Sequence, residues 1–207
     1  MPCRCFRMAF LVVLMLFNTL LEASTASTPS LKRGAVVFMN YCSGCHGLRY
    51  LSESRMKADL RLTPHSTVHL GNRLLLSPIE FAETWPQIAM ATEDAQAWFG
   101  ITPPDLSLVY AQRGSAWLTA YLQGFYLDHT RSFGVSNTLL PQVRMPNVLE
   151  SVQDDLSQQD FALVVADIVG FLEYAADPSV LMRRRLGIAV VGFFMLFALL
   201  FWRRMVR

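Results

Sequence analysis

The sequence predicts a mainly α-helical domain followed by a single C-terminal transmembrane helix, and three observations support this fold class. Apolar residues recur at helical spacing over residues 31–41 and again over 157–176. The motif Cys-Ser-Gly-Cys-His occupies residues 42–46, directly after the first of these segments. Residues 186–202 form an uncharged, strongly apolar run between two clusters of arginine.

The first 26 residues are typical of an export signal. Arg4 and Arg7 supply positive charge, residues 8–21 form an apolar stretch, and small residues lead to a predicted cleavage site near Ala26. The apolar stretch is shorter than a comfortable transmembrane helix. An uncleaved N-terminal anchor is the alternative interpretation.

The Cys-x-x-Cys-His motif predicts one covalently attached haem c, and hence a cytochrome c-type haem domain. The thiols of Cys42 and Cys45 would each bond one haem vinyl group, and His46 would supply an axial nitrogen to the iron. A zinc site needs two more ligands, and the only other cysteines, Cys3 and Cys5, precede the apolar stretch of the export signal. A redox dithiol does not require a histidine after its second cysteine.

Two helices are predicted from periodicity on either side of the domain. Residues 31–41 place a helix immediately before the haem motif, and residues 157–176 form an amphipathic helix that Asp177-Pro178 ends. Residues 107–112 and 117–125 are predicted as two further helical segments. Prolines punctuate the rest of the middle of the domain.

Met145 is the predicted sixth ligand of the haem iron. It lies in a proline-marked loop before the last helix of the domain, and histidine–methionine ligation raises the reduction potential of an electron carrier. By chemistry alone, Met56 and Met90 are rival ligands. Bis-histidine ligation is the other alternative, through one of three unassigned histidines: His65, His69 and His129.

The C-terminal apolar run predicts a membrane anchor. Three arginines at 183–185 precede it, Arg203, Arg204 and Arg207 follow it, and long basic side chains can reach both interfaces of a bilayer. Because the export signal carries the body of the chain across the membrane, the haem domain is expected on the periplasmic side of a bacterial inner membrane. The predicted division is a signal peptide at 1–26, a haem domain at 27–180 and an anchor with a short basic tail at 181–207.

The exported part of the chain is acidic, although the whole chain has a net charge of +2. Residues 31–178 contain ten Lys and Arg against fifteen Asp and Glu, a net charge of −5. This balance favours a basic protein partner over nucleic acid, since opposite charges speed encounter. The alternative is that the charge only keeps an exported domain soluble.

Several segments together resemble the cytochrome c1 family over essentially the whole chain after the export signal. The haem motif is common to c-type cytochromes, whereas the Pro-Pro-Asp-Leu-Ser run combined with a C-terminal anchor is far more specific. The matching segments are Arg33–Ala35, Asn40–His46, Leu48–Tyr50, Trp98–Gly100, Pro103–Leu108, Arg113-Gly114 and Met145-Pro146.

The resemblance implies the haem-bearing subunit of the cytochrome bc1 complex, which is a ubiquinol:cytochrome c oxidoreductase. It implies cytochrome b and a Rieske iron–sulfur protein as partners. Electrons would arrive from the Rieske protein and leave to a cytochrome c, while quinol chemistry would belong to cytochrome b.

The resemblance also implies roles for individual residues. Met145 matches the axial methionine of the family, and Arg113 matches an arginine that meets a haem propionate. Pro103 and Pro104 match residues that pack along the haem, where a rigid loop without N–H groups suits an apolar ring face.

A glycine of the first helix is also expected to allow close approach of the last, as in other c-type cytochromes. This predicts Gly34 against Phe171 or Tyr174. The chain departs from mitochondrial members in its short segment between Tyr50 and Trp98 and in lacking a strongly acidic run for docking cytochrome c. These departures suggest a compact bacterial form.

Two other functions compete with this interpretation. A free-standing, membrane-tethered c-type cytochrome would carry the same haem motif, ligands and anchor. A gas or redox sensor would instead need a labile sixth ligand. No Gly-rich phosphate loop and no GxSxG nucleophile motif supports a transferase or hydrolase.

Overall fold

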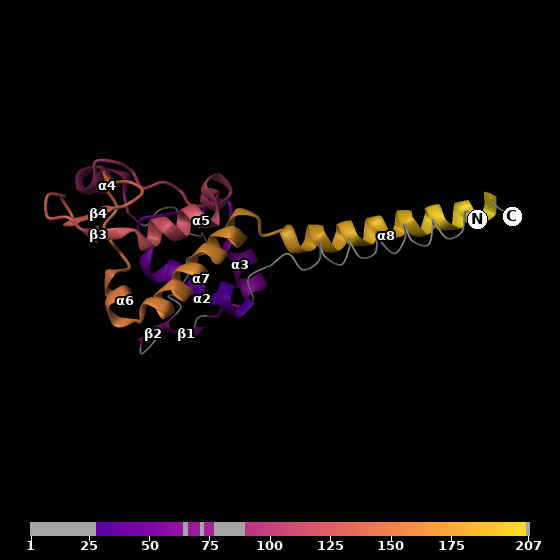
Figure 1. Ribbon diagram of the computed structural model, residues 1–207, viewed down its shortest axis with the longest axis horizontal. Coiled ribbons are helices and arrows are strands. Elements are labelled where there is room, and N and C mark those ends of the chain that lie inside the picture. Colours follow the sequence, from indigo (N-terminus) through magenta and orange to yellow (C-terminus); the bar gives the residue numbers. More distant parts are fainter. Residues whose placement is uncertain (1–27, 64–65, 71–72, 77–89, 206–207) are drawn as a thin grey trace.

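Figure 1 shows the computed structural model, which describes residues 28–63, 66–70, 73–76 and 90–205. The predicted export signal lies outside the described residues. The helices are α2 (Thr28–Tyr41), α3 (Glu53–Leu60), α4 (Thr92–Phe99), α5 (Val109–Gln123), α6 (Glu150–Asp155), α7 (Gln158–Ala176) and α8 (Val180–Met205). Two antiparallel hairpins pair β1 (Thr67–Leu70) with β2 (Arg73–Leu76) and β3 (Phe125–Leu127) with β4 (Val135–Asn137). The predicted mainly α-helical fold class is confirmed.

The predicted helices at the two ends of the domain are present as α2 and α7. α7 begins at its N-cap Ser157, whose hydroxyl accepts a hydrogen bond from the backbone N–H of Asp160 at 3.1 Å. Its apolar face lies in the core, and Asp177 forms its C-cap, as the sequence predicted. The side chains at helical spacing therefore point inward along one stripe.

The middle of the domain agrees with the prediction in part. The two expected helical segments are both present in α5 and meet at a break at Gly114, where φ is 77° and ψ is 167°. This conformation is essentially restricted to glycine, so the bend depends on that residue. Phe125 starts strand β3 instead of ending a helix, because its backbone pairs with Asn137 of β4.

α2 and α7 cross in the domain (Figure 1), and Gly34 of α2 lies at their contact. A Cβ atom at Gly34 would lie 2.0 Å from the carbonyl oxygen of Asp167 and 2.9 Å from the Cβ atom of Phe171. The fully buried rings of Phe38 and Phe171 pack there with centroids 5.5 Å apart. The predicted packing of Gly34 against Phe171 is confirmed, since a larger residue would separate the helices.

An ion pair fixes this crossing at its edge. Arg33 Nε donates to Oδ2 of Asp167 at 2.7 Å, and Arg33 Nη2 donates to Oδ1 at 3.1 Å. The Ser30 hydroxyl also bonds to the Asp167 carboxylate. The two-point contact with Arg33 opposes rotation of one helix against the other.

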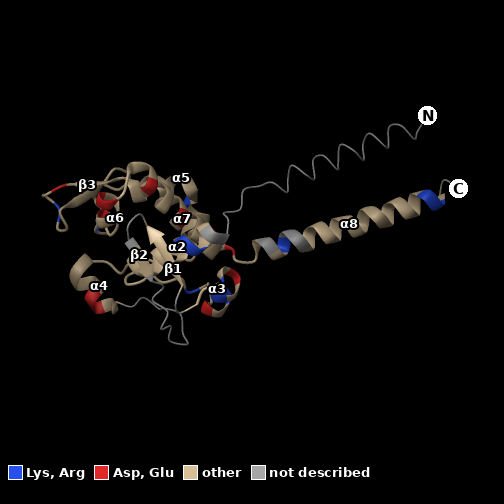
Figure 2. Cartoon of the chain, turned by 90° about the horizontal axis from the view of Figure 1, so that it is seen from below, with Lys and Arg blue, Asp and Glu red and all other residues tan. Residues whose placement is uncertain are grey.

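α8 leaves the domain as one long helix (Figure 1), and the stretch Leu186–Met205 of it has a mean hydropathy of 2.1. Twenty residues at about 1.5 Å per residue span about 30 Å, the thickness of a bilayer core. None of this span is buried against the domain. In Figure 2, blue basic residues mark both ends of the helix, including Arg203 and Arg204 in the last turn.

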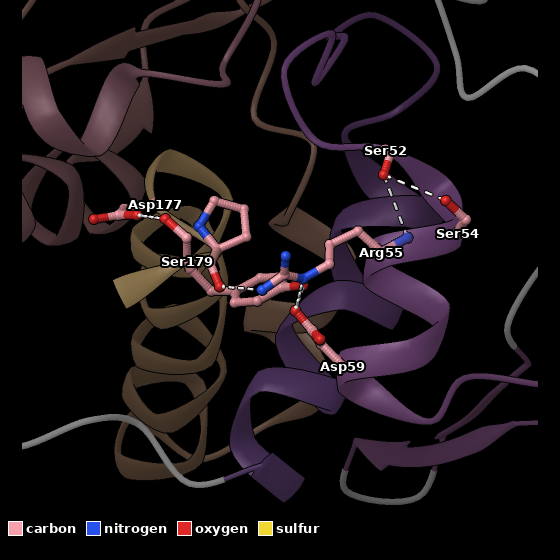
Figure 3. Close-up of polar contacts among 8 residues, drawn as sticks. Ser52, Ser54, Arg55, Asp59, Asp177 and Ser179 are labelled. Carbon is pink, nitrogen blue, oxygen red and sulfur yellow. Dashed lines mark hydrogen bonds and ion pairs between the residues drawn. The ribbon is translucent and has the colours of Figure 1, made fainter. Parts of the chain in front are cut away.

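The junction between the domain and α8 is held by α3. Figure 3 shows Arg55 reaching toward this junction, where its Nη2 donates to the carbonyl oxygen of Pro178 at 3.0 Å. Arg55 Nε donates to Asp59 Oδ2 at 2.5 Å, and the hydroxyl of Tyr174 on α7 donates to the same oxygen at 2.9 Å. These bonds connect α3, α7 and the start of α8.

Candidate haem-binding site

The cysteines and the histidine of the motif lie on a turn that continues directly from α2. Cys42 N–H donates to the carbonyl oxygen of Phe38, and the N–H groups of Cys45 and His46 donate to that of Cys42. Both thiols are free. Burial raises the pKa of Cys42 to about 12 and also raises the pKa of Cys45. A redox-active dithiol uses a lowered thiol pKa, so the raised values argue against the redox-dithiol alternative.

His46 is held in one orientation by a backbone carbonyl. Its Nδ1–H donates to the carbonyl oxygen of Pro104 at 2.7 Å. Burial lowers the pKa of His46, although this hydrogen bond and the charge of Asp105 act in the opposite direction. The imidazole is therefore neutral at pH 7, and its Nε2 lone pair is free to bind a metal.

The Pro-Pro-Asp-Leu-Ser run is joined to the haem motif by a series of hydrogen bonds. Leu106 N–H donates to the Gly47 carbonyl oxygen, and Arg49 N–H donates to Asp105 Oδ2, both at 2.9 Å. The buried hydroxyl of Ser107 accepts from the N–H of Tyr50 at 3.1 Å. The run thus fixes both the backbone after His46 and the carbonyl that orients its ring.

Met145 lies half-buried in the loop before α6, and its sulfur has a partner that the sequence did not suggest. The hydroxyl of Tyr121 donates to Met145 Sδ at 3.6 Å. The preceding residue, Arg144, donates from Nη1 to the carbonyl oxygen of Phe99 at 3.1 Å, which ties this loop to the end of α4. Burial raises the pKa of Tyr121 to about 12.

Three side chains contact one another in succession along α5, namely Arg113, Trp117 and Tyr121. The guanidinium of exposed Arg113 lies 4.9 Å from the Trp117 ring centroid, and the Trp117 and Tyr121 rings stack at 5.0 Å and 8°. The four-residue spacing of Trp117 and Tyr121 was the available signal for their stacking, whereas the break at Gly114 lies between Arg113 and Trp117. Contact of Arg113 with a haem propionate, and packing of Pro103 and Pro104 along a haem, stay predictions.

The alternative ligands occupy different environments. Met56 is fully buried in the apolar core, where its thioether packs against other side chains. Met90 borders an open hollow of about 410 Å³ together with Gly44 of the motif. His69 lies exposed on β1, His129 lies exposed between β3 and β4, and His65 lies outside the described residues.

The chemistry of these residues fits a covalently bound haem. Two free thiols stand beside an imidazole whose outer nitrogen is available, and a thioether lies in a separate loop. The segments that carry Pro104 and Met145 also expose large apolar side chains, which a haem face would cover. They are Ile101 (51% exposed), Leu108 (39%), Leu139 (40%) and Leu140 (46%).

Comparison with known proteins places the chain in a family. The sequence model of the Cytochrome C1 family matches residues 80–206. A cytochrome c1 of Allochromatium vinosum is 38% identical over 191 residues, covering 79% of this chain and 77% of that protein. The ammonia monooxygenase gamma subunit of Nitrosomonas europaea is 32% identical over 195 residues, covering 81% and 77%.

A solved structure is also similar in part. A chain of a hyperthermophilic respiratory Complex III matches 84% of this chain and 72% of its own length, with 23% identity and a TM-score of 0.45.

Proposed function

The chain belongs to the cytochrome c1 family, and on that premise we propose that it passes electrons from a Rieske iron–sulfur protein to a cytochrome c. It is the haem-bearing electron-transfer subunit of a cytochrome bc1 complex and binds one covalent haem c. The observation that best supports this role is the hydrogen bond from His46 to the Pro104 carbonyl, which orients the imidazole beside the free thiols of Cys42 and Cys45.

The proposal assigns each part of the site a task. Cys42 and Cys45 would fasten the haem, and His46 and Met145 would supply the two protein ligands of its iron. The haem supplies reversible one-electron chemistry when bound. Because Pro104 fixes the His46 ring and the loop of Met145 is tied to α4, neither ligand has to move between oxidation states.

The protein is anchored in a membrane by a single C-terminal helix. We extend this to a complete arrangement, with a signal peptide at 1–26, a haem domain at 27–180 facing the periplasm and an anchor at 181–207. Cytochrome b would hold the quinol chemistry beside the anchor. The acidic charge of residues 31–178 supports a basic acceptor cytochrome.

Purification through this chain in mild detergent tests the assembly. Recovery of b-type haem and an iron–sulfur protein, with reduction of the c haem by quinol, is the expected result. A c-type haem recovered alone from intact membranes would instead favour the membrane-tethered shuttle. Recovery with monooxygenase subunits would place the chain in an assembly like that of its Nitrosomonas relative.

Two leucine variants test the sixth ligand, because leucine is similar in size to methionine but has no sulfur. Met145→Leu is expected to abolish the absorption band of methionine-ligated ferric haem and to lower the reduction potential. Met90→Leu is the matched control and is expected to keep that band. The opposite pattern would assign the ligand to Met90.

A further inference from the structure

We infer that Tyr121 is a positioning residue for the iron ligand, and that its hydroxyl raises the reduction potential by hydrogen bonding to Met145 Sδ. The inference rests on the proposed role of Met145 as the sixth ligand. The contact is direct, with the hydroxyl oxygen 3.6 Å from the sulfur, a normal distance for a sulfur acceptor.

The ring of Tyr121 is fixed on both sides, so the hydroxyl cannot easily turn away. Trp117 stacks on it at 5.0 Å, and Phe125 meets it edge-on, with centroids 5.5 Å apart and planes at 70°. The Tyr121 carbonyl oxygen accepts a hydrogen bond of 2.8 Å from the side chain of the fully buried Asn137. The phenol therefore reaches Met145 from a rigid support.

The direction of the effect follows from the two lone pairs of a thioether. One pair can bind iron while the other accepts the hydrogen bond from Tyr121. That bond withdraws electron density from the sulfur, and ferric iron depends more on donated density than ferrous iron does. The hydrogen bond consequently stabilises the reduced state, which is how groups beside a ligand tune a haem.

The Tyr121 bond also limits where the sulfur can lie. The loop of Met145 is also tied to the domain through the preceding residue, Arg144, which bonds to the end of α4. A flexible thioether with three rotatable bonds adopts several positions unless a polar partner selects one. Tyr121 and Arg144 together therefore restrict the positions that the Met145 sulfur can occupy.

The test is Tyr121→Phe in the full membrane-bound, haem-loaded protein, read by equilibrium redox titration. Phenylalanine keeps the ring that stacks on Trp117, so the variant removes the hydroxyl alone. We expect the reduction equilibrium to shift about two- to tenfold toward the oxidised form, at most about 59 mV for one electron. The band of methionine ligation should remain, because Met145 is still present.

Tyr126→Phe is the matched control, since it removes a tyrosine hydroxyl from an exposed position on the neighbouring strand β3. It should leave the potential unchanged. A Tyr121→Phe protein with the wild-type potential would overturn the inference. If Met145→Leu kept the methionine band, the ligand assignment and this inference would fall together, while covalent haem attachment through Cys42 and Cys45 would stand.

Discussion

The α2–α7 crossing and the segment from Trp98 to Val148, here called the ligand segment, use apolar residues in opposite ways. At the crossing, large apolar side chains are buried against protein, with Phe38 and Phe171 fully covered. The ligand segment leaves Trp98 69% exposed and Ile101 51% exposed, although its helix α5 packs Leu118 into the core.

The two regions of the domain are therefore stabilised in different ways. The crossing buries its surface by helix packing, so it requires close complementarity between protein surfaces. The ligand segment retains exposed apolar surface that a bound haem would cover in part. We therefore expect the crossing to depend on its own sequence and the ligand segment to depend on the cofactor.

The largest expected effect is that of losing the haem. A Cys42→Ala/Cys45→Ala protein should lose about 4 kcal/mol or more of local stability in the ligand segment, because a bound cofactor stabilises only what it contacts. α7 should change far less. Amide hydrogen exchange of the two regions measures this directly.

Ser43→Ala is the control for this experiment, since it changes the same turn but keeps both thiols. It should retain haem and wild-type exchange in the ligand segment. If haem removal lowered the protection of amide hydrogens equally in α7 and in the ligand segment, it would contradict the expectation that only the ligand segment depends on the cofactor.

The next largest effect is expected from Gly34→Ala at the crossing. Alanine favours a helix over glycine by about 1 kcal/mol, but its Cβ would lie 2.0 Å from a backbone oxygen of Asp167. The clash should dominate and destabilise the domain by about 3 kcal/mol, as measured by denaturant unfolding in detergent.

Gly187→Ala serves as its control, because a Cβ added at that position of α8 meets nothing within 4 Å. It should leave the unfolding midpoint of the domain unchanged. A Gly34→Ala protein as stable as the wild type would show that the two helices can separate at low cost.

A smaller effect, confined to the ligand segment, is expected from Gly114→Ala. A Cβ there would touch nothing within 4 Å, so the cost is conformational rather than steric. Holding alanine at φ 77° costs about 1–3 kcal/mol. Hydrogen exchange should increase around the α5 bend and not at the crossing, and an increase at both places would refute this assignment.

The smallest effect concerns Asp105 and depends on pH. Burial raises its pKa, but hydrogen bonds from Ser107 and from the backbone of Arg49 outweigh this, so the pKa lies below its usual range. The stabilisation is therefore complete above the unfolded pKa near 4 and is lost as the pH falls through the lower, folded pKa.

Asp105→Asn should accordingly cost about 1 kcal/mol at pH 7, since an amide offers one acceptor oxygen where the carboxylate offers two. The difference from the wild type should shrink below about pH 4. Unfolding curves at several pH values check this, and a difference that stayed constant with pH would assign the effect to packing instead.

Much of the architecture was predictable from local patterns. Apolar periodicity located α2 and α7, and the length and flanking charges of 186–202 located α8. The motif Cys-x-x-Cys-His identified the haem chemistry, because its residue types and spacing are themselves the chemical requirement. The hairpins were not predicted, since their strands are short and pair through backbone contacts that periodicity does not reveal.

The sequence by itself determined helices α2, α7 and α8 and the haem motif, because each depends on residues close together in the chain. Helices α3, α4 and α6 were not predicted, and Met145 as the sixth ligand stays a prediction. Only the tertiary structure decided that the Pro104 carbonyl orients His46 and that the Tyr121 hydroxyl reaches Met145. Those contacts join residues 58 and 24 positions apart. Their partners are chosen by how α2, α5 and α7 pack, which no local pattern in the chain specifies.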